Sequence, residues 1–195
     1  MAEAPAFETV TAAALRTDPA RAIRLAALAC SAQPAFYEII PASRDAVLGA
    51  VARQIADPRF DMADALVLRE DAAIVTGVAL PSLAAAQMAA MAALLRLVPG
   101  AETKTVVTRL RAYSAGIEPI EDSGHYISRV AVAPECRGKG LGRRIVGEYV
   151  RRLGPAKVHL HVHRDNAPAI ALYRSLGYAP RSAANYAFAA FTRLP

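Results

Sequence analysis

Apolar residues in the first third of the chain recur every three or four positions, the spacing of a helix with one buried face. One such stripe runs to Cys30 and follows Asp18 and Pro19, a capping residue and a first-turn proline that are typical of a helix start. A second stripe follows Ser43 and stops at residues 57–58, an Asp-Pro pair. The pattern predicts two helices in this part of the chain.

Shorter apolar runs rich in β-branched residues predict strands at residues 7–10, 65–69 and 73–80. The polar pair Glu70 and Asp71 separates the last two runs and predicts a hairpin turn. Two further helices are expected at 82–98 and 102–114, because a Pro-Gly pair divides an alanine-rich helical pattern there. A polar loop follows at 116–124.

The second half of the chain alternates strands and helices more clearly. A strand is predicted over residues 125–132, where Ile127, Val130 and Val132 are the strongest β-formers, and Pro134 ends it. The elements predicted after it are a helix at 140–153, a strand at 158–163, a helix at 165–175 closed by a glycine, and short strands at 178–181 and 186–192. This order predicts a mixed α+β sheet with one βαβ crossover near its middle.

Composition limits the kinds of protein that this chain can be. Its 195 residues suit one domain, and a hydrophobic fraction of 54% with a mean hydropathy of +0.24 is ample for a core. The formal net charge of +6 favours an anionic ligand, which includes nucleic acid, an acidic membrane surface and a polyphosphate cofactor.

Neither a secreted nor a membrane protein is expected. Cys30 and Cys136 stand far apart without metal-ligand spacing, which favours reduced thiols over a disulfide or a zinc site. No basic segment followed by an apolar run marks a signal peptide. The most apolar stretch, residues 83–98, contains Gln87 and Arg96 and is too short to span a bilayer. We therefore expect a cytoplasmic protein without a membrane partner.

Three alternate glycines, Gly138, Gly140 and Gly142, lie just before a predicted helix. Glycine lets the backbone turn sharply and approach a ligand, and a helix start presents unpaired N–H groups and a partial positive charge. Basic side chains surround the same loop: Arg137, Lys139, Arg143 and Arg144. The combination predicts a pyrophosphate site.

Two nucleotide-binding motifs do not fit this loop. A P-loop requires GxxxxGK[ST], which the sequence lacks, and the dinucleotide fingerprint GxGxxG would require a glycine where Arg143 stands. The spacing that fits is R/Q-x-x-G-x-G/A, met by Arg137, Gly140 and Gly142. This spacing resembles the acetyl-CoA signature of the GCN5-related N-acetyltransferase (GNAT) superfamily.

Two flanking segments strengthen the resemblance. Residues 127–134, a strand that runs into a proline, are similar to the family's approach to the loop. Downstream, residues 166–178 are similar to the family's NxxAxxLYxxxGF ending, with Tyr178 in place of the commoner Phe. The resemblance is close over residues 126–178. It extends to the first 80 residues only in the order of the elements, and residues 83–124 match no motif of the family.

The resemblance implies the GNAT fold, an α+β (mixed α/β) arrangement. We expect a central twisted mixed sheet of six to seven strands, splayed at the cofactor site and flanked by helices, with a two-helix elaboration before the cofactor strand. Residues 1–195 would form a single domain. It would consist of an N-terminal half at 1–80, the helical elaboration at 81–124 and an acetyl-CoA-binding half at 125–195.

The resemblance also implies acetyl-CoA as co-substrate, with no metal. Backbone groups of Val130 and Val132 would pair with its pantetheine arm, Asn166 would bond the arm's amide region, and Ala169 would leave room for it. The full set of residues that the resemblance assigns to binding is Val130, Ala131, Val132, Arg137, Gly138, Lys139, Gly140, Leu141, Gly142, Arg143, Asn166, Ala169 and Tyr173.

The implied reaction is direct attack of a primary amine on the thioester in a ternary complex. Tyr173 matches the family's general acid and would protonate the departing sulfur. A backbone amide near Val130 or Ala131 would stabilise the oxyanion. The general base is left open. The weak candidates are Glu118, Glu121, Asp122 and His125, although for each of them solvated loop surface is the favoured interpretation. An amine that arrives deprotonated would need no base.

Other residues allow further readings. Alternation puts His159, His161 and His163 on one face of a strand. Three histidines on one face could bind a metal, contact the substrate or transfer protons. Their neighbours already supply the core face, so we expect the histidines on a polar, partly exposed face. Cys136 beside the loop could be a nucleophile, although direct transfer needs none.

The acceptor is also open. The acidic loop would suit a cationic amine such as a polyamine, an aminoglycoside, a lysine side chain or a protein N-terminus, whereas the alanine-rich helices hint at a small, partly apolar one. The alternative function is a catalytically silent acyl-CoA sensor or scaffold, against which Tyr173 argues. The arginine pairs at 143–144 and 151–152, on one predicted helix, suggest nucleic-acid binding as a third function. No aromatic platform accompanies them, so we do not expect a nucleic-acid partner. A homodimer remains an open alternative.

Overall fold

The central sheet separates two hydrophobic cores. The computed structural model describes residues 7–57, 59–62, 65–120, 123–182 and 185–195. Its seven strands have the order β1-β2-β3-β4-β5-β7-β6, and every neighbouring pair is antiparallel except the parallel pair of β4 and β5. The strands are β1 (Phe7–Val10), β2 (Ala65–Leu68), β3 (Ala73–Ala79), β4 (His125–Val132), β5 (Val158–His163), β6 (Ala179–Pro180) and β7 (Phe188–Arg193). The predicted mixed sheet of six to seven strands is confirmed.

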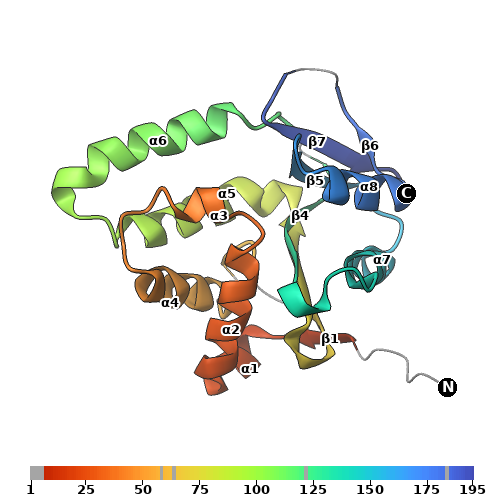
Figure 1. Ribbon diagram of the computed structural model, residues 1–195, viewed down its shortest axis with the longest axis horizontal. Helices are drawn as coiled ribbons and strands as arrows, with labels where there is room; N and C mark the ends of the chain where they lie inside the picture. Colours follow the sequence, from red (N-terminus) through yellow and green to blue (C-terminus); the bar gives the residue numbers. More distant parts are fainter. Residues whose placement is uncertain (1–6, 58, 63–64, 121–122, 183–184) are drawn as a thin grey trace.

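Helices cover both faces of this sheet (Figure 1). In chain order they are α1 (Ala12–Thr17), α2 (Pro19–Cys30), α3 (Pro34–Tyr37), α4 (Arg44–Ile55), α5 (Leu80–Leu95), α6 (Thr103–Ala115), α7 (Leu141–Leu153) and α8 (Ala167–Ser175). Short 3-10 turns lie at Arg69–Asp71, Gly100–Glu102 and Pro134–Cys136. In Figure 1, α2 and α4 lie on one side of β4 and α7 on the other, and each side has its own cluster of buried apolar residues.

Local signals explain where most helices begin. The side chain of Asp18 accepts a hydrogen bond from the N–H of Arg21, and that of Ser43 accepts one from Ala46, as the predicted caps require. The helices α1 and α3 were not predicted, because pieces of 6 and 4 residues are too short to show a helical period. No helix in the described ranges combines the length and the apolarity that crossing a membrane would require.

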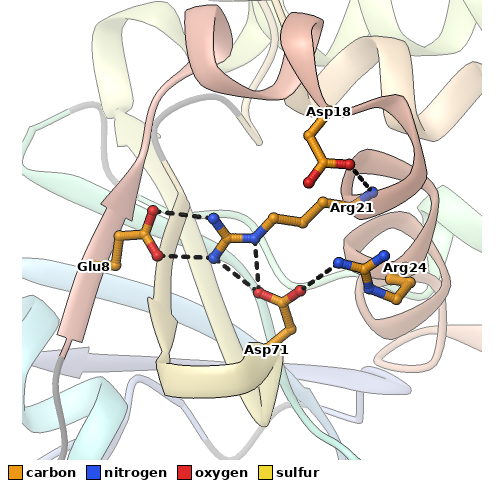
Figure 2. Close-up of polar contacts among 5 residues, drawn as sticks. All are labelled: Glu8, Asp18, Arg21, Arg24 and Asp71. Carbon is orange, nitrogen blue, oxygen red and sulfur yellow. Dashed lines mark hydrogen bonds and ion pairs between the residues drawn. The ribbon is translucent and has the colours of Figure 1, made fainter.

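Hydrogen bonds from a side chain of α2 connect the predicted hairpin turn to β1. Glu70 and Asp71 have positive φ values of 62° and 57°, as the turn of a tight two-strand hairpin requires. Figure 2 shows the guanidinium of Arg21 donating to the carboxylate of Asp71 at 2.9 and 3.0 Å and to that of Glu8 at 2.8 and 3.0 Å. One side chain of α2 thereby joins β1 to the β2–β3 turn. The hydrogen bonds from Arg21 also lower the pKa of Glu8.

A β-bulge in β4 changes which residues face each core. Thr76 of β3 pairs with Arg129, whereas the next residue, Gly77, pairs with Ile127, so Ser128 is the extra residue. Beyond the bulge, Arg129 therefore shares its side of the sheet with Tyr126. Glycine is required opposite the bulge, because a Cβ at position 77 would lie 2.4 Å from the carbonyl oxygen of Tyr126.

The strands β4 and β5 diverge soon after they meet. Their ladder consists of two residue pairs, His125 with Val158 and Tyr126 with His159. Farther along, β4 stays paired with β3 and β5 with β7. The predicted splay in the sheet is therefore confirmed, and it opens beside the glycine loop.

Candidate active site

A groove of about 600 Å³ lies between β4, the glycine loop and α8. It brings together every residue predicted to bind the cofactor except Lys139, whose side chain is exposed beside it. The predicted residues that line it are Val130, Ala131, Val132, Arg137, Gly138, Gly140, Leu141, Gly142, Arg143, Asn166, Ala169 and Tyr173. Cys136 lines it too.

The loop has the backbone shape that an anion site requires. Gly138 and Gly140 have φ values of 76° and 73°, in the left-handed region that glycine adopts without strain. Gly140 caps α7 without a side-chain hydrogen bond, so the first N–H groups of that helix are available to a ligand. Of the neighbouring cations, Arg137 donates to the carbonyl of Val132 at 3.2 Å and Arg143 to that of Ser175 at 3.2 Å.

A narrow passage leads from this groove through the gap between β4 and β5. It has a volume of about 110 Å³ and shares Val130, Asn166, Ala169 and Tyr173 with the groove. At its other end it shares a different set of residues with a cavity of about 380 Å³: Gln33, Arg129, His161 and Phe188. Groove, passage and cavity are therefore consecutive.

We call this last space the inner cavity. Its wall comes from α3, α5, the end of α6 and the strands β4, β5 and β7, and it includes Phe36, Met91, Leu94 and Tyr113. The helices predicted as an elaboration thus form much of it. Two charged residues, Asp61 and Arg129, also line it.

Tyr173 lies where the groove meets the passage. Its side chain is buried at 7% exposure, and its ring packs edge-on against that of Tyr178 with centroids 5.8 Å apart. Burial raises the pKa of Tyr173. A phenol with a raised pKa keeps its proton at neutral and alkaline pH, so Tyr173 can act as a hydrogen-bond donor beside the groove.

The predicted base candidates do not gather at the passage. Glu118 is buried at 5% exposure, not solvated, and its carboxylate accepts hydrogen bonds from the N–H of Ala190 at 2.7 Å and the hydroxyl of Ser182 at 2.5 Å. These bonds turn it toward β7. Glu121 and Asp122 lie outside the described residues.

His125 lies on the α7 side of the sheet. It stands at the start of β4, and its Nε2 is 2.8 Å from the hydroxyl oxygen of Tyr149. Burial lowers the pKa of His125. Residues that line the groove, the passage or the inner cavity do not include it.

The prediction that the three strand histidines are partly exposed is wrong for His159. His159 is fully buried, with its Nδ1 2.9 Å from the hydroxyl of Thr192 and its Nε2 3.1 Å from the carbonyl of Ser123. His161 is half-buried and lines both the passage and the inner cavity, and only His163 is exposed. The carbonyl oxygens of Glu118 and Ser123 meet this face of β5, which no local pattern predicted.

The hydrogen bonds of His161 fix its tautomer. Its Nε2 lies 2.6 Å from the carbonyl oxygen of Glu118, which can only accept, so Nε2 carries the hydrogen. Its Nδ1, 3.0 Å from the hydroxyl of Tyr126, then accepts from that hydroxyl. Burial lowers the pKa of His161 and favours the neutral ring. Sequence reasoning did not foresee this pair, which comes from two different strands.

Residues 105–178 match the family model described as the acetyltransferase (GNAT) family. Among curated relatives, the mycothiol acetyltransferase of Corynebacterium urealyticum is 42% identical over 65 residues, which cover 31% of this chain and 19% of that protein. The N-alpha-acetyltransferase RimI of Mycobacterium tuberculosis is 38% identical over 52 residues, or 27% of this chain and 33% of that one. The chain spans a third or less of the length of these relatives.

Solved structures share the fold over nearly the whole chain. An N-acetyltransferase from Staphylococcus aureus Mu50 superposes with a TM-score of 0.66 at 17% identity, covering 89% of this chain and 96% of that one. A second structure, titled as an acetyltransferase, gives a TM-score of 0.64 at 16% identity and covers 97% of this chain and 98% of the other. At these identities the likeness concerns the fold.

Proposed function

Because residues 105–178 match the GNAT family model, we propose that the chain is a member of that family and an acetyl-CoA-dependent N-acetyltransferase that acts on a primary amine. One observation carries the proposal: the groove with the glycine loop continues through the splayed strands into the inner cavity. Two substrates could thus enter from the two ends of the passage and meet within it, as direct attack in a ternary complex requires. The acetyltransferase names of the relatives support the same reading.

The groove suits a polyphosphate thioester. The N–H groups at the start of α7 and the arginines beside them would hold the pyrophosphate. The edge of β4 at Val130 and Val132 has no strand partner on the β5 side and would pair with the pantetheine arm. Asn166 caps α8 through its Oδ1, which leaves its amide NH₂ for the arm. Acetyl-CoA bound there would supply the thioester.

The proposed transfer would use residues of the passage and of the inner cavity beside it. A backbone N–H near Val130 or Ala131 would stabilise the oxyanion, and Tyr173 would protonate the leaving sulfur. We assign the base to the pair of Tyr126 and His161. The phenol oxygen of Tyr126 would accept a proton from the amine while its own proton passes to Nδ1 of His161, whose Nε2 hydrogen stays on a carbonyl.

The test is amine-dependent release of the CoA thiol. The protein is incubated with acetyl-CoA and a panel of amines, thiol is followed with a chromogenic reagent, and N-acetylated products are identified by mass. We expect acetyl-CoA to bind and at least one amine to be acetylated well above the amine-free control. Binding without any amine-dependent release would favour the silent sensor or scaffold, and absence of binding would overturn the proposal.

A further inference from the structure

The inner cavity contains a positive charge in an otherwise mainly apolar wall. Arg129 lies in β4 directly after the bulge and lines both the cavity and the passage, so its guanidinium is close to the point where the amine must react. The guanidinium group stays protonated at any physiological pH. A substrate that occupies the cavity must therefore accommodate this cation.

The protein uses only part of the hydrogen-bonding capacity of Arg129. A guanidinium has five N–H donors. Nη1 donates to the carbonyl of Ser128 at 2.7 Å, Nη2 makes a long contact of 3.4 Å to the hydroxyl of Tyr37, and the buried Nε has no partner within the described residues. Donors therefore remain on both terminal nitrogens. A carboxylate is the group whose geometry matches them best.

Asp61 is the other charged residue of the cavity. It is buried at 3% exposure, and its charge interacts with that of Arg129, although the two side chains form no direct ion pair. The cavity thus offers one positive and one negative group. This balance suits a substrate that itself carries both charges. It disfavours polyamines and aminoglycosides, whose several cations would all face Arg129.

On the premise of the acetyltransferase activity above, we propose that the acceptor carries a carboxylate beside its amine, as an α-amino acid with an apolar side chain does, and that Arg129 binds this carboxylate. Because Arg129 lies at the mouth of the passage, a carboxylate held there places the adjacent amine next to Val130 and Tyr173. The side chain extends between Phe36, Met91 and Leu94. A volume of about 380 Å³ is near the lower end of small-molecule sites, which fits so small an acceptor.

The test compares amino acids with the amines that lack only the carboxylate. Alanine, leucine, methionine and phenylalanine are each paired with their decarboxylated amine, and kcat/KM is measured at saturating acetyl-CoA. We expect the best amino acid to exceed its partner by about 30-fold, the usual size of a charge-assisted hydrogen-bond pair. Equal or faster acetylation of the decarboxylated amines overturns the proposal, and this comparison in the wild-type protein needs no variant.

Variants locate the effect at Arg129. Arg129→Gln should remove most of the preference for the carboxylate, Arg129→Lys should keep part of it, and Arg53→Gln, on the exposed face of α4, should leave it unchanged. Binding of acetyl-CoA to each variant reports that it is folded. A preference that survives Arg129→Gln in a folded variant overturns the assignment.

The two proposals fail in different ways. If amines are acetylated without regard to a carboxylate, the acetyltransferase function stands and only the acceptor class is wrong. If no amine is acetylated, both are wrong.

Discussion

Tyr173→Phe tests the proposed general acid with a single atom. The variant keeps the aromatic ring, and therefore the packing against Tyr178, but has no proton to donate. No hydrogen bond joins the Tyr173 hydroxyl to another described residue, so its removal leaves no protein group unpaired and should change the free energy of unfolding by less than about 1 kcal/mol. General acids contribute roughly 10²- to 10⁴-fold. Because a thiolate is already a fair leaving group, we expect the low end, about 100-fold in kcat or about 2.7 kcal/mol.

The pH profile gives a second measure of the same role. The acid works only when protonated, and burial raises the pKa of Tyr173 above its ordinary value of 10.0. Its proton is therefore retained until the pH exceeds that value. We expect kcat of the wild type, followed by thiol release at saturating acetyl-CoA, to show no alkaline loss from this group up to about pH 10.

Tyr178→Phe is the matched control. Tyr178 is also a buried tyrosine whose pKa is raised by burial, but its hydroxyl has no partner within the described residues and it does not line the groove. Its variant should therefore keep wild-type turnover. The reasoning is refuted if Tyr173→Phe retains a third or more of the wild-type kcat, or if both variants lose activity equally.

Three further predictions concern stability and pH. Gly77→Ala would place a Cβ 2.4 Å from a carbonyl oxygen of β4 and should lower the free energy of unfolding in urea by about 3 kcal/mol. Gly49→Ala in α4, where the nearest atom lies at 3.7 Å, should instead raise it by about 0.5 kcal/mol. Similar effects at both sites would contradict the packing argument. Arg21→Ala removes the ion pairs with Glu8 and Asp71 and should lower the free energy of unfolding by about 2 kcal/mol. Replacement of the more exposed Arg24 by Ala should lower it by less than about 0.5 kcal/mol. Equal losses would mean that the network does not add to stability. A base must be unprotonated to act, and burial lowers the pKa of His161. Activity should therefore rise with pH along an acid limb centred below 6.5, and His161→Asn should abolish this limb. If the limb persists in the variant, another group is responsible for it.

Short-range patterns were enough to identify the segments that line the groove. The glycine loop, the strand before it and the helix with Asn166 and Tyr173 all lie within residues 126–178, and each has a local signature. The structure brings these segments into one groove, as the family resemblance implied. Their individual roles in binding remain predictions.

The inner cavity could not be predicted in the same way. Its wall combines Tyr37, Asp61, Arg129 and Phe188, which are separated by long stretches of chain and follow no common period. The face of the sheet on which Arg129 lies depends on the bulge at Ser128. Simple alternation along the strand would have placed Arg129 and Tyr126 on different faces. A charged residue between apolar strand positions was the only signal in the sequence. It did not indicate on which face of the sheet that residue would lie.

The burial of His159 was missed for a related reason. Alternation separated the two faces of β5 correctly, with Val158 and Leu160 in one core. It could not reveal that the chain near Ser123 and Thr192 of β7 would cover the other face. Tertiary coverage of a polar strand face is a long-range property, so a local pattern understates burial there.

The short ladder between β4 and β5 has a consequence for the protein without its ligands. Beyond Tyr126 and His159 the two strands leave facing edges inside the sheet, and the backbone groups that no protein group pairs there must bond to water or to an extended guest. Amide hydrogens at Val130 and Val132 on this edge should exchange quickly with solvent and slow when acetyl-CoA is added. Until such a guest is bound, the same edge is a template on which the extended segment of another chain could pair, so saturation with acetyl-CoA should also suppress aggregation.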